Sequence, residues 1–178
     1  MEERGKLREL ISHNEISAAV KRLAAAINED YAGKEPVLVG VLNGSFIFLS
    51  DLVRLINMTV EVDFIRASSY GSGTVSRGEV SVMDGPGKGL AGRDVIVVED
   101  IIDTGLTAVK IIDRIKAMSP SSVKVCTLLD KPAGRKTDFR ADYVGIEVDG
   151  VFIVGYGLDL DEKYRNLKGL YVMEEDIL

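Results

Sequence analysis

Short runs of consecutive apolar residues, separated by segments of helical periodicity, constrain the fold of this chain more than any other feature. The runs occupy residues 37–42, 94–98 and 123–129. They lack polar alternation and are too short for buried helices, which is typical of strands covered on both faces of a parallel sheet. Apolar residues recur every three or four positions over residues 14–30 and 104–118. Strands that alternate with such helices predict an α/β fold, a doubly wound and mostly parallel sheet flanked by helices.

Shorter elements complete this pattern. Asn14 is the expected N-cap of the first helix, residues 46–56 are predicted to be helical, and residues 159–165 form a polar turn or short helix. Further strands are predicted over residues 60–64, 79–83, 143–148 and 151–154. Residues 68–78 form the longest polar stretch, rich in Gly and Ser, and are expected to be a functional loop at the tip of an extended hairpin.

Composition and charge indicate one domain over residues 1–178. Hydrophobic residues make up 46% and charged residues 28% of the chain, values that exclude a disordered or fibrous protein. The formal net charge of −6 argues against a nucleic-acid partner, because such binding depends on Lys and Arg. No apolar run reaches the roughly 18 residues of a membrane span, and the first residues lack the apolar segment of a secretory signal. We therefore expect a cytoplasmic protein that binds no membrane.

Several familiar motifs are absent or stand in the wrong context. The chain has one cysteine, Cys126, and one histidine, His13, which excludes a disulfide framework and a Cys/His zinc cluster. His13 is expected to be an exposed or capping residue. No P-loop motif occurs. Residues 87–92 match Gly-x-Gly-x-x-Gly, but a strand follows them where a dinucleotide site requires a helix.

Residues 97–107 carry the clearest chemical information. Glu99 and Asp100 follow an apolar run, Asp103 comes three residues later, and a Thr-Gly turn precedes a predicted helix. A helix N-terminus offers free N–H groups to a phosphate, and neighbouring carboxylates can bind a sugar diol or Mg²⁺. Asp103 and Thr104 could instead simply cap the helix. Three carboxylates so close together repel one another unless a cation or ligand compensates, so the pattern favours a sugar-phosphate site.

This segment resembles the phosphoribosyl-pyrophosphate (PRPP) signature of type I phosphoribosyltransferases. The likeness continues in the same order through residues 41–45, 67–71, 128–132 and 152–159, and Arg165 lies six residues after Asp159. These motifs are similar to those of the hypoxanthine-guanine branch and span most of the chain. The resemblance implies that a small hood and a flexible hairpin loop accompany the sheet.

The resemblance also implies roles for individual residues. The PRPP- and nucleotide-binding segment would comprise Glu99, Asp100, Ile101, Ile102, Asp103, Thr104, Gly105, Leu106 and Thr107. Asp103 would be the catalytic base near purine N7. The purine would be bound by Lys131, Phe152, Ile153 and Asp159. The pyrophosphate would be bound by Asn43, Gly44 and Arg165. Ser69 and Tyr70 would belong to a lid loop, and Glu99, Asp100 and Asp159 would hold Mg²⁺.

The implied reaction transfers a phosphoribosyl group from PRPP to hypoxanthine or guanine, and it yields IMP or GMP and pyrophosphate with Mg²⁺ as cofactor. A homo-oligomer, dimer or tetramer, is also implied. Family members commonly carry a basic residue where this chain has Asn43, so PRPP affinity is the property that this departure should change. A transferase for xanthine or a pyrimidine, an RNA-binding regulator on the same scaffold and a phospho-receiver module remain as alternatives.

Overall fold

The computed structural model describes residues 7–69, 80–86 and 89–173. The strands of the main sheet are β2 (Val37–Leu42), β3 (Glu61–Ser69), β4 (Val80–Asp84), β5 (Asp94–Ile102), β6 (Ser122–Asp130) and β7 (Tyr143–Glu147). The strands of a smaller sheet are β1 (Leu7–Ile11), β8 (Ile153–Val154) and β9 (Leu170–Met173). The helices are α1 (His13–Asp30), α2 (Phe46–Val53) and α3 (Leu106–Lys116), with one 3₁₀ turn η1 (Pro132–Gly134).

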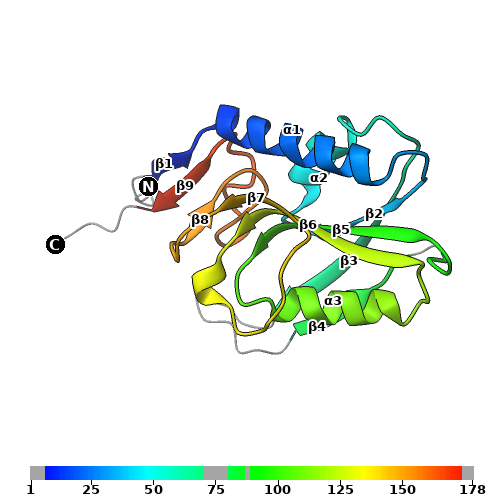
Figure 1. The fold of residues 1–178 in the computed structure, drawn as a ribbon. Helices are drawn as coiled ribbons and strands as arrows, with labels where there is room; N and C mark the ends of the chain where they lie inside the picture. The colour runs from blue at the N-terminus through cyan, green and yellow to red at the C-terminus, as the bar shows by residue number, and fades with distance from the viewer. Residues whose placement is uncertain (1–6, 70–79, 87–88, 174–178) are drawn as a thin grey trace.

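The main sheet confirms the doubly wound α/β prediction. Its strand order is β4-β3-β2-β5-β6-β7, and all neighbouring pairs are parallel except β3 and β4. Helices α1 and α2 cover one face and α3 covers the other (Figure 1). Alternate residues of the central strands therefore enter two separate cores: Ile96 and Val98 pack with α1 and α2, whereas Val95 and Val97 pack with α3. This two-sided burial explains why the central strands have continuous apolar sequences.

A three-stranded antiparallel hood, of order β1-β9-β8, stands beside the main sheet (Figure 1). The sequence pattern did not predict β1 or β9. Both are short; in β1 only the last residue, Ile11, is buried, and in β9 only Leu170 and Val172 are, a signal too weak to separate from loop. The hood nevertheless matters for the site, because it holds the residues that follow β7.

The paired strands β3 and β4 confirm the extended hairpin. Arg66 to Ser69 pair antiparallel with Asp84 to Val80, with one irregularity in register. The expected lid residue Ser69 is the last residue of β3. Tyr70 and the rest of the segment 70–79 lie outside the described residues.

Several predicted boundaries were wrong. Strand β3, predicted over residues 60–64, continues to Ser69, and β8, predicted over residues 151–154, begins at Ile153. The N-cap of α1 is Ser12, because its side chain and that of Glu15 form a reciprocal capping box. Helix α2 ends at Val53, before residue 56. Strand β5 continues past Val98 to Ile102, so α3 begins only at Leu106.

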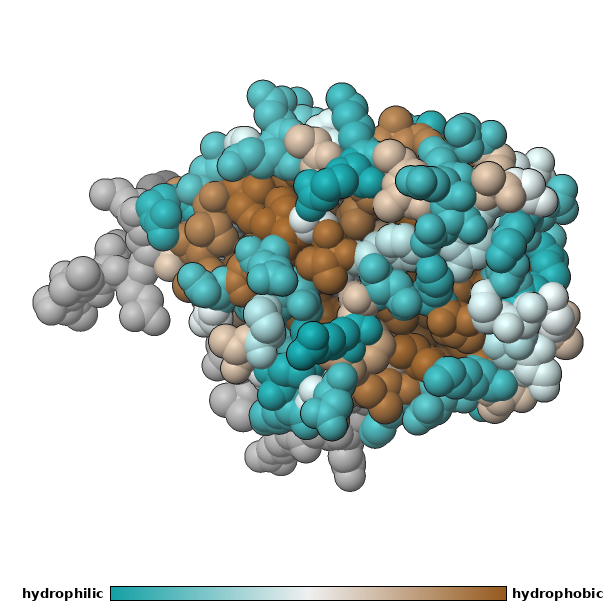
Figure 2. Space-filling view, viewed as in Figure 1, coloured by the Kyte–Doolittle hydropathy of each residue, from teal (hydrophilic) through white to brown (hydrophobic). Residues whose placement is uncertain are grey.

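Figure 2 shows the surface on the side viewed in Figure 1. Apolar residues gather near the hood and around α3, separated by polar residues. Within residues 7–69, 80–86 and 89–173, none of the helices combines the length and apolarity needed to span a membrane.

The capping box supplies a test of the N-terminal boundary. Ser12→Ala should lower the free energy of unfolding by about 1 kcal/mol, because it leaves N–H groups of the first turn without a partner. Asn14→Ala should cost less than about 0.5 kcal/mol, since Asn14 is exposed and Ala is the better helix former. Urea denaturation of both variants measures the difference. A larger loss for Asn14→Ala would contradict the assignment.

Candidate active site

Three loops meet where parallel neighbours β2, β5 and β6 end. The 43–45 turn joins β2 to α2, residues 103–105 join β5 to α3, and Lys131 follows β6 directly. Ligands of open α/β sheets bind beyond the carboxyl ends of their strands. The sequence-predicted residues of these three loops are therefore brought together by the topology itself.

The loop between β5 and α3 forms a site for an anion. Gly105 has a φ of +80° and is the N-cap of α3. The first i→i−4 hydrogen bond of the helix runs from the Val109 N–H to the Gly105 carbonyl. The N–H groups of residues 106–108 thus have no acceptor within the helix. The Leu106 N–H donates to the Thr104 hydroxyl oxygen at 3.4 Å, which leaves the N–H groups of residues 107 and 108 free. Free N–H groups and the helix dipole suit a phosphate at this position.

A second loop, residues 131–137, holds the anion loop in place. The Lys136 N–H donates to the Thr104 carbonyl at 2.9 Å, and the Arg135 Nε donates to the Asp103 carbonyl at 3.0 Å. Arg135 also forms an ion pair with Asp130 in which both side chains are 12% exposed. A Cβ at Gly105 would lie 2.9 Å from the Arg135 Cδ, so only glycine allows this packing. The sequence analysis did not identify Arg135, whose role depends on contacts far apart in the chain.

Of the two acids of the predicted signature, Glu99 is buried and Asp100 is partly buried, and both lie within β5 rather than beyond its end. Glu99 is 6% exposed, and its Oε2 atom has no hydrogen-bond partner. Burial raises the pKa of Glu99 to about 8, and the neighbouring Asp100 carboxylate adds to that shift. Burial also raises the pKa of Asp100 to about 6, although backbone hydrogen bonds and Arg165 act in the opposite direction. Both groups would be relieved by a cation or by hydroxyl donors.

Neighbouring residues of a strand point to opposite faces, so Glu99 and Asp100 address different parts of the site. The Asp100 carboxylate lies against Gly44, where any Cβ would overlap it. Gly44 is therefore required in the 43–45 turn for a steric reason. The peptide bond between Leu42 and Asn43 is cis, and the Asn43 side chain is exposed.

The loop of residues 155–165 brings Asp159 and Arg165 to the same place. Arg165 Nη2 lies 2.8 Å from Asp159 Oδ1, and its Nη1 donates to the Gly157 carbonyl at 2.8 Å. A Cβ at Gly157 would overlap the Gly44 carbonyl. The 155–165 loop thus packs directly on the 43–45 turn, as expected if both contact one ligand group.

Lys131, Val151 and Phe152 form the other side of the site. Lys131 is 8% exposed, and its Nζ donates to the Val151 carbonyl at 2.6 Å. Phe152 is 45% exposed despite its size, so its ring is available to a planar ligand. The Ile153 side chain is buried in the core, which leaves its backbone for any ligand contact. The structure thus places the 43–45 turn, Asp100, Asp159 and Arg165 together, and Lys131 beside Val151; Ser69 is the last residue of β3.

The acidic residues fit a hard cation such as Mg²⁺. Glu99 Oε2 is buried without a partner, and Asp100 lies near Asp159 closely enough for that carboxylate to raise its pKa. Across the described part of the chain, no group of three or more Asp, Glu, His or Cys side chains forms a ready-made metal cage. Mg²⁺ commonly binds through one or two carboxylates together with substrate phosphates, so the donor set agrees with an ion that arrives with its ligand.

The raised pKa of Glu99 predicts a pH dependence of stability in metal-free protein. Between pH 4.5 and about 8 the folded chain keeps a proton on Glu99 that the unfolded chain has released. Stability should therefore fall as the pH rises through that range. Asp100 contributes similarly only up to about pH 6. In Glu99→Gln the decline between pH 6 and 8 should disappear. Urea denaturation in the presence of a chelator measures how the free energy of unfolding changes with pH in the natural chain and in Glu99→Gln. Equal slopes in the two proteins would contradict the interpretation that Glu99 is a buried, protonated acid.

Comparisons with known proteins agree with this geometry. A family model described as the phosphoribosyl transferase domain matches residues 7–161. The chain is 49% identical over 168 residues to a hypoxanthine-guanine phosphoribosyltransferase of Streptococcus thermophilus (strain CNRZ 1066), which covers 94% of this chain and 93% of that protein. It is 45% identical over 165 residues to the corresponding protein of Bacillus subtilis (strain 168), with 93% and 92% covered.

A solved structure gives the same result. The crystal structure of a hypoxanthine-guanine phosphoribosyltransferase from Bacillus anthracis superposes with a TM-score of 0.89 at 46% identity, covering 96% of this chain and 100% of that one. The architecture and the order of site residues thus agree with a single group of enzymes. The chain belongs to the phosphoribosyltransferase family, in its hypoxanthine-guanine branch.

Proposed function

We propose that this chain transfers a phosphoribosyl group from PRPP to hypoxanthine or guanine, releasing pyrophosphate. The observation that carries the proposal is the anion loop at the start of α3, with buried acids on one side and Lys131 and Phe152 on the other. A 5′-phosphate matches the free N–H groups of residues 107 and 108 and the Thr104 hydroxyl, and the ribose hydroxyls match Glu99 and Asp100. The purine then lies toward Phe152.

Base recognition follows from hydrogen-bond direction. Lys131 donates through Nζ, and its bond to the Val151 carbonyl fixes where that ammonium group points. The O6 atom of hypoxanthine or guanine accepts from such a group, whereas adenine presents an amino donor there. Phe152 stacks on the purine ring, and backbone groups of Ile153 and Asp159 read its 2-position edge.

Proton removal is assigned to Asp103. Its carboxylate is exposed and lies in the space that Gly134 leaves, since a Cβ at Gly134 would overlap it. The backbone of Asp103 is fixed by Arg135 at 3.0 Å. A carboxylate so held can accept the proton lost from the purine as the new glycosidic bond forms.

Charge on the leaving pyrophosphate is neutralised by Arg165 and by the 43–45 turn. Arg165 is directed by its bonds to Asp159 and Gly157. Mg²⁺, held by Glu99, Asp100 and Asp159 together with the ligand, would supply further positive charge to the phosphates and ribose oxygens. The residues of the chain orient the substrates around that ion.

A pyrophosphate-release assay tests the proposal directly. The chain is incubated with PRPP, Mg²⁺ and one base at a time: hypoxanthine, guanine, xanthine, adenine or uracil. Release with hypoxanthine or guanine but not adenine supports the proposal. Release with xanthine or uracil alone would assign the alternative transferases, and no release with any base would refute the enzyme assignment.

Asp103→Asn should lower turnover by about 10²–10⁴-fold, the usual contribution of a positioned general base, while PRPP affinity changes little. The amide keeps the size of the carboxylate but accepts no proton. Turnover at saturating substrate and PRPP binding by calorimetry measure the two effects separately. Near-normal turnover would remove Asp103 from the base role.

Asn43→Lys should lower KM for PRPP about fivefold, the roughly 1 kcal/mol expected of one exposed charge pair. Asn57→Lys makes the same charge change at an exposed position where the chain enters β3, at the opposite end of the sheet, and should leave KM unchanged. If both substitutions lowered KM for PRPP equally, the cause would be the change in the net charge of the protein and not the position of Asn43. No effect of Asn43→Lys would show that the 43–45 turn acts through its backbone alone.

A further inference from the structure

Three successive residues of the 155–165 loop have left-handed backbone conformations. The φ angles of Gly155, Tyr156 and Gly157 are 102°, 48° and 103°. Glycine adopts such angles readily, but tyrosine does so only at a cost in free energy, because its Cβ approaches the following carbonyl. The sequence analysis assigned no role to Tyr156. Its conformation must be held by surrounding contacts.

Those contacts extend from the loop to helix α2. The Tyr156 hydroxyl donates to Asp51 Oδ2 at 2.6 Å, and its N–H donates to the Leu167 carbonyl at 2.9 Å. The tyrosine is 3% exposed, and burial together with the Asp51 carboxylate raises the pKa of its hydroxyl, so the group remains a donor at neutral pH. The other carboxylate oxygen of Asp51 pairs with Arg54, which fixes the direction of the acceptor.

The turn made by Tyr156 sets the position of Arg165. The Gly157 N–H donates to the Arg165 carbonyl at 3.0 Å, and the Gly157 carbonyl accepts from Arg165 Nη1 at 2.8 Å. Both the backbone and the guanidinium of Arg165 are therefore bonded to the residue that follows Tyr156. The Nη2 atom of Arg165 pairs with Asp159 at 2.8 Å and with Glu162 at 3.0 Å, so the turn at Gly157 fixes the other side of the guanidinium, at Nη1.

Asp51 belongs to helix α2, the helix that follows the 43–45 turn of the same site. Helix α2 starts at Phe46, directly after the 43–45 turn, and Asp51 lies on it between Phe48 and Leu52, which are buried. Gly157 itself packs on the Gly44 carbonyl. The Tyr156–Asp51 bond thus joins the 155–165 loop to the helix that begins at the 43–45 turn.

We propose that Tyr156 and Asp51 are positioning residues that hold Arg165 and the 43–45 turn at the spacing required by pyrophosphate. This inference rests on the proposed function, since it assigns both segments to one ligand group. Neither side chain touches the ligand. Loss of the bond should weaken binding of the pyrophosphate group and leave purine binding at Lys131 and Phe152 unaffected.

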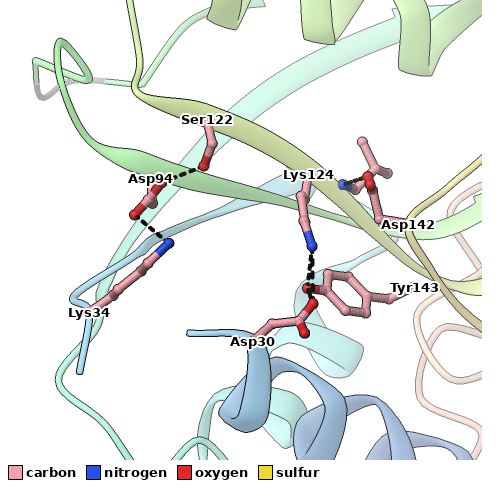
Figure 3. Close-up of polar contacts among 8 residues, drawn as sticks. Asp30, Lys34, Asp94, Ser122, Lys124, Asp142 and Tyr143 are labelled. Atoms are coloured by element: carbon pink, nitrogen blue, oxygen red, sulfur yellow. Dashed lines mark hydrogen bonds and ion pairs between the residues drawn. The ribbon is translucent and has the colours of Figure 1, made fainter. Parts of the chain in front are cut away.

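The chain offers a matched control at the opposite end of the sheet. Tyr143, the first residue of β7, donates its hydroxyl to Asp30 Oδ2 at 2.5 Å, and Lys124 bonds to the same oxygen at 3.0 Å (Figure 3). Tyr143 is 7% exposed. Tyr143→Phe therefore removes a bond of the same kind from a buried tyrosine, together with the bond that its hydroxyl accepts from Lys124 at 3.2 Å, far from the carboxyl ends of the strands.

The experiment compares Tyr156→Phe, Asp51→Ala, their double variant and Tyr143→Phe with the natural chain. Tyr156→Phe should raise KM for PRPP and the inhibition constant of pyrophosphate about tenfold, the loss expected of one hydrogen bond to a charged group. KM for hypoxanthine should stay within about twofold. The double variant should be no worse than either single one, because the two residues form one interaction. Asp51→Asn, which keeps an acceptor, should restore most of the affinity.

Tyr143→Phe should lower the melting temperature about as much as Tyr156→Phe does, and it should leave KM unchanged for both PRPP and hypoxanthine. Equal effects of Tyr156→Phe and Tyr143→Phe, or a rise in KM for hypoxanthine as large as that for PRPP, would overturn the inference. If Tyr156→Phe does not fold, the same comparison of KM for PRPP, KM for hypoxanthine and pyrophosphate inhibition is made with Asp51→Ala and Asp51→Asn. Calorimetry with inorganic pyrophosphate and Mg²⁺ separates the two proposals. If the variants transfer the phosphoribosyl group normally and bind pyrophosphate as tightly as the natural chain does, only the positioning role is refuted. If the natural chain itself binds no pyrophosphate, both proposals are refuted.

Discussion

The placement of two adjacent carboxylates within β5, Glu99 buried and Asp100 partly buried, is the constraint on which the rest of the site depends. Glu99 has an unpartnered oxygen, while Asp100 faces the 43–45 turn. Buried charge without compensation is costly, and hydrophobic residues would serve the sheet better at these positions. In the metal-free chain burial favours the protonated form of Glu99, and a cation or a polyhydroxyl ligand would stabilise both carboxylates. Their presence therefore points to ligand binding.

Most of the remaining site is built from backbone, and its precision comes from contacts between loops. Gly44 leaves room for Asp100, Gly105 for Arg135, and Gly157 for the Gly44 carbonyl. Each glycine lets two segments approach at a distance that any Cβ would prevent. Such sites need rigid support, and the bonds from Arg135 to the Asp103 carbonyl and from Tyr156 to Asp51 supply it.

The sequence predicted the parallel core strands and the acidic signature because both are local patterns: buried strands are apolar, and the signature is contiguous. It did not predict β1 and β9, whose stability comes from pairing with each other across the length of the chain. It placed the end of β5 too early, since charged residues normally stop a buried strand and Glu99 is an exception made for function. Tyr156 and Arg135 went unassigned because their contacts appear only after folding.

The proposed function requires that main-chain N–H groups at the start of α3 bind the phosphate of a phosphoribosyl ligand beside the acids of β5. Calorimetric titration of the chain with IMP, followed by titration of Thr107→Pro, tests this most directly. The proline removes one N–H group in the first turn of α3, where that group has no acceptor within the helix. Saturable binding to one site per chain is expected, with a loss of about tenfold or more in affinity in the variant. Unchanged affinity, or no binding by the natural chain, would contradict it.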